Sequence, residues 1–355
     1  MEVIKHSAVD YFFERLATPR EEIYKKFIPI ARAARSCYVD VSAFAGITDD
    51  EFFSMMFVDA IFLVQFIGSL GSDHRLDSMV SPYLVGITRD MMLLENQIPW
   101  LVVQFFMALS PSPLSLEQIV QQLILWTGLI TKEPLVVDLG ESFKPSHLLC
   151  LLRSYRAGRS GRRRVDPRRF SAGKVTTSAG ELTKMGIELR AGKTTANFSG
   201  MDLVKGPLFA HLSLVPLYLE SVTACWLVNM AALETYTESA TMGDDCSINS
   251  YLAFVSSLMN REQDVRELRA RGIVDGFSDQ HTLDFFEGLS QYLTPGHVYL
   301  RTMLDIQEYK KGRWLWIAVY RFLHSNWKTI ATVLPVVSVL VGILKTLLSL
   351  KQHTS

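Results

Sequence analysis

The sequence predicts a mainly α-helical protein: a helical body, a small strand-containing segment around residues 187–219, and one C-terminal transmembrane helix. Most of the chain carries apolar residues at three- and four-residue spacing, which is the period of an amphipathic helix. Mixed apolar runs bounded by turn residues, typical of strands, are found around 187–219. A long uncharged run, TIATVLPVVSVLVGIL, lies near the C-terminus and predicts the membrane helix.

Composition limits the classes of function. The chain has 355 residues, 48% of them hydrophobic, with 36 basic and 36 acidic side chains. It is long enough for two domain-sized units or one large one. The balanced charge gives no overall attraction to nucleic acid or anionic lipid, so any electrostatic function must be local. The four cysteines are far apart and form no CxxC pair, which indicates buried thiols in a reducing compartment.

Residues 1–152 are expected to form an N-terminal helical half. Apolar periodicity predicts helices over 21–38, 49–70, 82–94 and 146–155. Ser115-Leu-Glu-Gln118 has the form of a capping box and predicts the start of another helix. The run at 49–70 is long and apolar, but Asp59 and Gln65 within it favour a buried core helix over a membrane span.

Residues 153–176 are expected to be an exposed linker. Eight arginines face a single acid between residues 153 and 174, and such a composition cannot build a core. Three interpretations of the arginines stay open: a solvated linker, which we favour, contact with anionic lipid, or contact with nucleic acid. The side chains concerned are Arg162, Arg163, Arg164, Arg168 and Arg169. Nucleic acid ranks last, because few aromatic residues are interleaved.

Residues 177–327 are expected to form a C-terminal α-rich half that packs on the first. Ser178-Ala-Gly-Glu181 has the form of a second capping box, and strands are predicted over 187–192 and within 204–219. Helices are predicted over 221–236, 248–259, 262–271, 281–293 and 301–327. Gly272 is expected to end the helix over 262–271.

Residues 328–350 are predicted to be the transmembrane helix. The segment that begins at Thr329 and ends at Leu350 has 22 residues. As a helix it would be roughly 33 Å long, enough for the ~30 Å hydrocarbon core. Residues 309–328 hold five basic side chains and no acid, so the positive-inside rule predicts a cytosolic body. We expect a single-pass C-terminal anchor, in the plasma membrane; the alternative is a buried C-terminal helix.

No catalytic, cofactor-binding or metal-binding residue is predicted. The sequence has no GxSxG or HExxH motif, and no histidine lies at metal-ligand spacing from a cysteine or carboxylate. Asp59, Asp90 and Glu95 are carboxylates in apolar surroundings, so a membrane-bound enzyme of unrecognised type stays open as an alternative.

The stretch MMLLENQIPW (residues 91–100) interrupts an apolar run with three polar residues. Pro99 cannot donate a hydrogen bond and disfavours helical geometry at Ile98, so one helix should end here and another begin. Such a joint leaves backbone groups without helical partners. Glu95, Asn96 and Gln97 are therefore expected to satisfy them, rather than to form a catalytic cluster.

ITRDMMLLENQIPWLVVQFF resembles the D-x-x-L-L-E-N-Q-I-P-F/W signature of the plant family called domain of unknown function 247. Further blocks resemble that family in the same order: EFFSMMFVDAIFLVQFI, HLLCLLRSYR, SAGELTKMGIEL, CWLVNMAALE and YLAFVSSLMNREQDVRELRARGIV. The family's usual N-terminal S-I-G-P-Y-H-H-G motif does not occur in this sequence. The resemblance implies a plant protein with an α-rich body, one C-terminal transmembrane helix and no established enzymatic activity; some grass members are linked to self-incompatibility.

The expected function is therefore that of a membrane-anchored, non-catalytic interaction or recognition protein with a protein partner. Self-incompatibility or signalling is the setting considered for this function. The two alternatives are a membrane-bound enzyme of unrecognised type and a regulator that contacts nucleic acid through the Arg-rich linker. No cofactor is expected.

Overall fold

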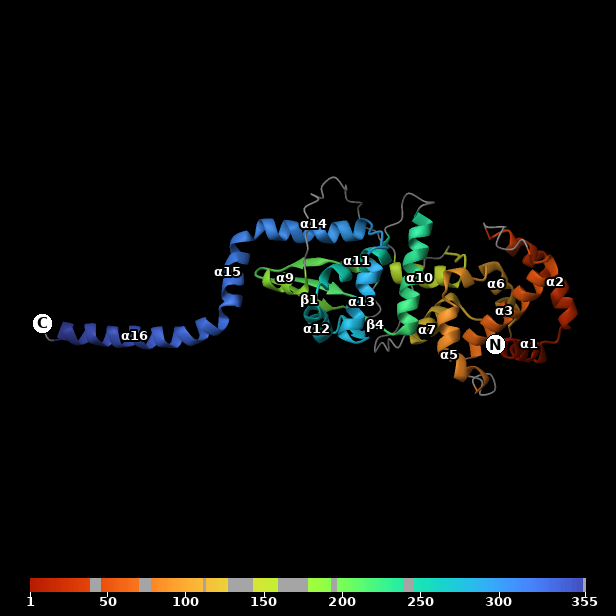
Figure 1. Ribbon diagram of the computed structural model, residues 1–355, viewed down its shortest axis with the longest axis horizontal. Coiled ribbons are helices and arrows are strands. Elements are labelled where there is room, and N and C mark those ends of the chain that lie inside the picture. The colour runs from red at the N-terminus through yellow and green to blue at the C-terminus, as the bar shows by residue number, and fades with distance from the viewer. Residues whose placement is uncertain are drawn as a thin grey trace.

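The computed structural model describes residues 1–38, 46–69, 78–110, 113–126, 143–158, 178–192, 197–238 and 246–353. The molecule is elongated, with the N-terminal helices at one end and a long C-terminal helix at the other (Figure 1). It is mainly helical with two small sheets, which confirms the predicted fold class for the body. Most of the predicted linker, residues 159–176, lies outside the described residues, and this includes Arg162, Arg163, Arg164, Arg168 and Arg169. Its predicted start is wrong, because residues 153–157 belong to a helix (Leu148–Ala157) in which Arg156 is buried.

The N-terminal end is a group of helices around α3 (Asp49–Ser69). The helices that pack against it are α1 (Glu2–Glu14), α2 (Arg20–Arg35) and α6 (Trp100–Leu109). Phe27, Phe57 and Phe106 meet at the centre with ring centroids 5.2 to 5.5 Å apart. Tilted and edge-on aromatic pairs of this kind each add roughly 0.5–1.5 kcal/mol beyond their buried area.

By length and composition alone, Asp49–Gly68 is the one helix of the described chain that could cross a membrane. Here 67% of that stretch is buried inside the body. Asp59 forms an ion pair with Lys5 of α1, at 2.7 Å, so its side chain lies on the side of α3 that faces α1. This helix therefore serves as the core helix that Asp59 and Gln65 predicted.

The next elements are short. They are η2 (Ser81–Tyr83), α5 (Leu84–Asp90), η3 (Leu94–Asn96), α7 (Leu116–Trp126) and α8 (Leu148–Ala157). The continuous helix predicted over 82–94 is wrong, because the chain leaves helical geometry after Asp90. The capping box is confirmed: Gln118 N donates to Ser115 Oγ at 3.2 Å, and Ser115 N donates to Gln118 Oε1 at 2.8 Å.

Two small sheets lie in the C-terminal half. After α9 (Ala179–Lys184) come β1 (Ile187–Ala191), η5 (Phe198–Gly200), β2 (Leu203–Lys205), β3 (Ala210–Leu214) and β4 (Leu217–Leu219). In the first sheet β3 is central, parallel to β1 and antiparallel to β2. In the second, β4 pairs in parallel with β5 (Val274–Gly276). The prediction that strands are confined to 187–219 is therefore incomplete.

Four helices follow around these sheets: α10 (Ser221–Glu238), α11 (Ser247–Leu258), α12 (Glu262–Ala270) and α13 (Asp279–Ser290). α10 packs against α5 and α8 on one side and α11 on the other, so it joins the two ends of the body (Figure 1). Gly272, with a φ of +69°, ends α12 as predicted, and Ile273 N donates back to Leu268 O at 2.9 Å.

The chain ends in α14 (His297–Gly312), α15 (Trp314–Ser325) and α16 (Trp327–His353). The single helix predicted over 301–327 is wrong, because Arg313 interrupts it. The Arg313 guanidinium donates to Gly206 O at 2.7 Å and Pro207 O at 3.0 Å, which fixes the turn against the body. In the described chain the apolar stretch of α16, Thr329–Ile343, is shorter than a full span, so transmembrane anchoring is not established.

The four cysteines are free thiols. Cys246 is buried, and Cys150 and Cys225 are partly buried. Cys37 is exposed at the end of α2, so the expectation of buried thiols is wrong for this residue. It lies two residues after the end of α2, a position that hydrophobic periodicity does not distinguish from the core.

Candidate functional site

Gln97 holds the corner between α5 and α6. Its Nε2 donates to Met91 O at 3.0 Å and to Leu93 O at 2.7 Å, and its Oε1 accepts from Leu149 N at 2.9 Å. These three backbone groups lie at helix ends, and Met91 O and Leu149 N lack partners within their own helices, whereas Leu93 O also accepts from Asn96 N at 3.0 Å. The predicted joint between helices is thus confirmed, with Gln97 as its principal side chain.

The other two polar residues of the corner differ in role. Asn96 Nδ2 donates to Asp90 O at 2.9 Å, so it also satisfies the backbone, although its side chain is exposed. Glu95 is exposed and caps no helix end among the described residues. The prediction that Glu95 satisfies a backbone group is therefore wrong.

The corner is tied to α10 by two long-range hydrogen bonds. Leu94 N donates to Asn229 Oδ1 at 2.8 Å, and Trp226 Nε1 donates to Thr88 O at 2.8 Å. Asn229 is oriented by a bond from its Nδ2 to Cys225 O at 2.9 Å. The LENQIP and CWLVNMAALE segments, more than a hundred residues apart in sequence, therefore contact each other directly.

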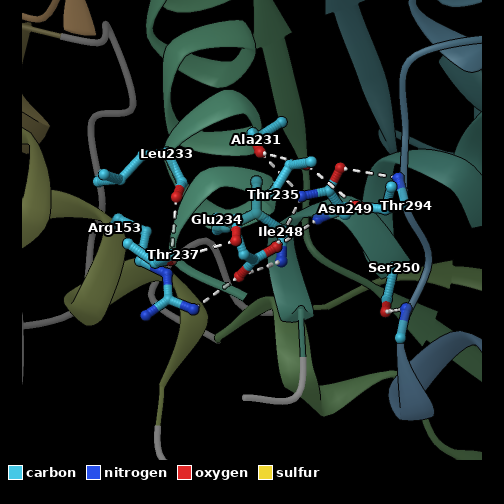
Figure 2. Close-up of polar contacts among 11 residues, drawn as sticks. Arg153, Ala231, Leu233, Glu234, Thr235, Thr237, Ile248, Asn249, Ser250 and Thr294 are labelled. Carbon is cyan, nitrogen blue, oxygen red and sulfur yellow. Dashed lines mark hydrogen bonds and ion pairs between the residues drawn. The ribbon is translucent and has the colours of Figure 1, made fainter. Parts of the chain in front are cut away.

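Glu234, at the end of the same segment, is completely buried. Figure 2 shows its carboxylate among four donors: Arg153 Nη2 at 3.0 Å, Ile248 N at 3.3 Å, Asn249 N at 2.8 Å and Asn249 Nδ2 at 3.1 Å. A buried carboxylate is costly unless it is paired and hydrogen-bonded, and here it is both. Two of the donors are free N–H groups at the start of α11, where the helix dipole also favours an anion.

Asn249 extends this network (Figure 2). Its Nδ2 donates to Ala231 O at 2.9 Å and its Oδ1 accepts from Thr294 N at 3.2 Å, while Ser250 Oγ accepts from Gly296 N at 2.9 Å. The bonds connect α10, α11 and the segment that leads into α14. These hydrogen bonds therefore position the helices relative to one another.

A cavity of about 640 Å³ lies between α1, α3, α5 and the corner formed by residues 94–97, called the LENQ corner below. Its volume is in the range of ligand pockets. Most of the lining is apolar, with buried side chains at the floor and more exposed ones at the mouth. The floor includes Met56, Phe62, Ile87 and Met91, and the mouth includes Met55 and Tyr83. Methionine side chains adapt their shape, so this lining suits an apolar ligand of variable outline.

The structure brings Asp59, Asp90 and Glu95 to the wall of this one cavity. The suggestion of buried carboxylates is wrong for Asp90, whose side chain is 51% exposed, and for Glu95. Two of the three already have cationic partners: Lys5 Nζ lies 2.7 Å from Asp59, and Arg89 Nη2 lies 3.1 Å from Asp90. Glu95 remains exposed to solvent at the mouth.

Lys5 is the cation of the cavity wall. Burial disfavours its ammonium form, but hydrogen bonds and charge from Asp59, helped by Glu2, outweigh this effect and raise the pKa of Lys5. Lys5 therefore stays protonated over the physiological range. Its ammonium group is held by Asp59 and is not poised to transfer a proton.

Tyr38 is a wall residue that sequence reasoning missed. Its Oη donates to Gln97 O at 2.9 Å, and burial raises the pKa of Tyr38 to about 12, so the phenol is neutral at physiological pH. Lys5 and Met55 were missed as well, because they come from separate helices and no spacing relates them to the LENQ segment. Tyr38 links the corner physically to the cavity.

The lining of the cavity is suited to binding a ligand. In the described parts of the chain, no three His, Cys, Asp or Glu side chains lie close enough to hold a metal ion. The cavity combines an apolar floor with acidic groups at the mouth, which suits a ligand with an apolar part and a positive charge.

The fold and this site define a mainly helical protein with an open apolar cavity among its N-terminal helices. An apolar helix, α16, projects from the opposite end of the molecule (Figure 1). A family model described as a plant protein of unknown function, DUF247, matches residues 1–341, and the chain belongs to this family. No curated protein and no solved structure matches it. The resemblance based on the LENQIP segment is thereby confirmed, and it assigns no activity.

Proposed function

We propose that this protein is a membrane-anchored, non-catalytic recognition protein, held by its C-terminal helix with the body in the cytosol. The observation that carries the proposal is the apolar surface of α16, which projects away from the body (Figure 1). Six of its large apolar side chains are 47% to 62% exposed: Val333, Val337, Val339, Leu340, Val341 and Ile343. Proteins in water rarely leave a continuous apolar surface of this kind uncovered.

The membrane span in this proposal runs from Thr329 to the end of the apolar residues at Leu350. The basic residues on its body side favour a cytosolic body, and Lys310, Lys311 and Arg321 are exposed there. Lys345 is exposed near the far end, where its side chain can extend to the interface. The plasma membrane is the expected location.

Recognition is proposed to use the cavity, which lies at the opposite end of the body from α16. The proposed ligand is a segment of a partner protein that places an apolar side chain on Met56 and Phe62 and a lysine or arginine near Glu95. Self-incompatibility signalling is one setting for such a protein. The enzyme alternative is less well supported, because Asp59 and Asp90 already pair with Lys5 and Arg89.

The anchor is tested with two charges in the middle of α16. In the full-length chain, Val337→Asp with Val341→Asp should raise the cost of insertion by roughly 5–7 kcal/mol and release the protein to the soluble fraction. Val337→Leu with Val341→Leu is the matched control and should stay in the membrane fraction. Release by neither pair, or by both, would contradict the anchor.

The cavity is tested with a photo-crosslinking amino acid at Tyr83, which is 51% exposed at its mouth. In the full-length protein in plant cells we expect a discrete protein adduct, weakened when Glu95→Lys is added. The matched control places the crosslinker at Tyr292, which is 73% exposed outside the cavity. The same adduct from both positions, or an adduct insensitive to Glu95→Lys, would exclude the cavity as the recognition site.

A further inference from the structure

We propose that α15 is an interfacial helix, which lies in the headgroup region of the membrane between the body and α16. This inference rests on the proposed anchoring by α16. It adds a second, peripheral contact that would fix the orientation of the body against the bilayer.

One face of α15 packs on the body. The rings of Trp316 and Tyr320 lie against Phe209, with centroids 6.3 Å and 5.3 Å away, and Ile317 is 6% exposed. This face of α15 is buried against the body. The side chains on the opposite face of the helix take no part in that contact.

The other face is apolar and open. Trp314, Leu315, Val319 and Phe322 are 65%, 61%, 51% and 62% exposed. At 3.6 residues per turn these four side chains fall within an arc of roughly 140°, opposite the packed face. Large aromatic and aliphatic side chains on one face of a helix, with basic residues nearby, are typical of helices that lie in the membrane interface.

The position of α15 fits this role. In Figure 1 it stands between the body and α16, and it runs across the direction of α16. A membrane crossed by α16 would therefore have its surface along α15, and the open face points away from the body. Only Asn326 separates the two helices, so insertion of α16 brings α15 to the surface.

Charge and attachment agree with this position. Lys310, Lys311 and Arg321 are exposed around α15 and can contact anionic headgroups. Arg313 has a different role, because its guanidinium is bound to Gly206 O and Pro207 O. It fixes the start of α15 to the body, so immersion of the helix also orients the body.

The test uses full-length protein with Cys37→Ser, reconstituted in vesicles of phosphatidylcholine and phosphatidylserine. An environment-sensitive fluorophore is attached at Val319→Cys on α15, at Val337→Cys on α16, or at Val85→Cys. Val85 is the matched control, because it is a 61% exposed valine on α5, far from α16. Lipids carry bromine either near the headgroup or deep in the chains, which quenches the probe at the corresponding depth.

We expect the Val319 probe to be quenched mainly by shallow bromine, the Val337 probe by deep bromine, and the Val85 probe by neither. Quenching at Val337 without quenching at Val319 overturns the interfacial helix and leaves the anchor intact. In that case the open face belongs to a protein contact. Absence of quenching at both positions overturns the anchor and this inference together.

Discussion

The carboxylate of Glu234 in α10 accepts a hydrogen bond from the backbone N of Asn249 in α11, at 2.8 Å. The residue at the N-cap position of α11 is Cys246, which makes no side-chain capping bond and has a φ of +35°. The start of α11 is therefore satisfied from α10 instead of by its own sequence. Through this cap Glu234 joins α10 to α11, and its contact with Arg153 adds α8.

Glu234→Gln is expected to lower the free energy of unfolding by roughly 3 kcal/mol or more, because it leaves Arg153 without its buried counter-charge and removes an acceptor. Arg153→Met should cost less, since the carboxylate keeps its other three donors from Ile248 and Asn249. Urea unfolding of the full-length protein in detergent measures both. An equal or larger loss for Arg153→Met would contradict the proposed order.

At the LENQ corner, Gln97→Leu is expected to cost about 2–4 kcal/mol, because it removes three hydrogen bonds and leaves Met91 O and Leu149 N without a partner. Asn96→Leu removes one bond at an exposed position and should cost about 1 kcal/mol. Thermal unfolding of the two variants compares them, and membrane fractionation should be unchanged in each. Equal destabilisation by the two substitutions would contradict the prediction that Gln97 contributes more to stability than Asn96.

Local chemistry made part of this structure predictable. Pro99 marked the corner, Ser115 and Gln118 marked a helix start, and Gly272 marked a helix end, because each acts on backbone groups within four residues. Such signals do not depend on the rest of the fold. For the same reason they predicted that polar residues at the corner would satisfy the backbone, and Gln97 and Asn96 do so.

Features made by distant residues were not predictable in this way. Arg313 breaks the expected helix over 301–327 because its partners are carbonyl groups near residue 206. The short strand β5 exists because it pairs with β4, far away in sequence. The cavity depends on Lys5, Tyr38 and Met55 meeting the LENQ corner, and no spacing in the sequence relates these residues.

His147 is expected to make stability depend on pH. It is the N-cap of α8, where its Nδ1 accepts from Cys150 N at 3.2 Å, and burial lowers the pKa of His147 from 6.5 to about 4. The folded state therefore disfavours the proton that the unfolded state binds. The stabilisation is fully present above about pH 6.5 and is lost as the pH falls toward 4.

The size of this effect is roughly 2–3 kcal/mol, allowing for the partial exposure of the imidazole. His147→Asn keeps an N-cap acceptor that does not titrate. Unfolding measured between pH 7 and pH 4 should show a smaller decrease for the variant than for the wild type. Parallel curves for the two proteins would mean that His147 is not the group responsible.

Gly158 at the end of α8 is expected to tolerate no larger residue. Its φ is +70°, and a Cβ there would lie 2.1 Å from Asn197 Nδ2. Gly158→Ala should cost roughly 1–3 kcal/mol from the backbone conformation alone, with more from displacement of Asn197. Gly288→Ala is the matched control, since that glycine lies in α13 with nothing within 4 Å of the added Cβ. It should stabilise the protein by about 0.5–1 kcal/mol, because alanine loses less backbone entropy in a helix. Opposite shifts in melting temperature for the two variants are the expected result, and a stabilising Gly158→Ala would show that the α8 end is free to change conformation.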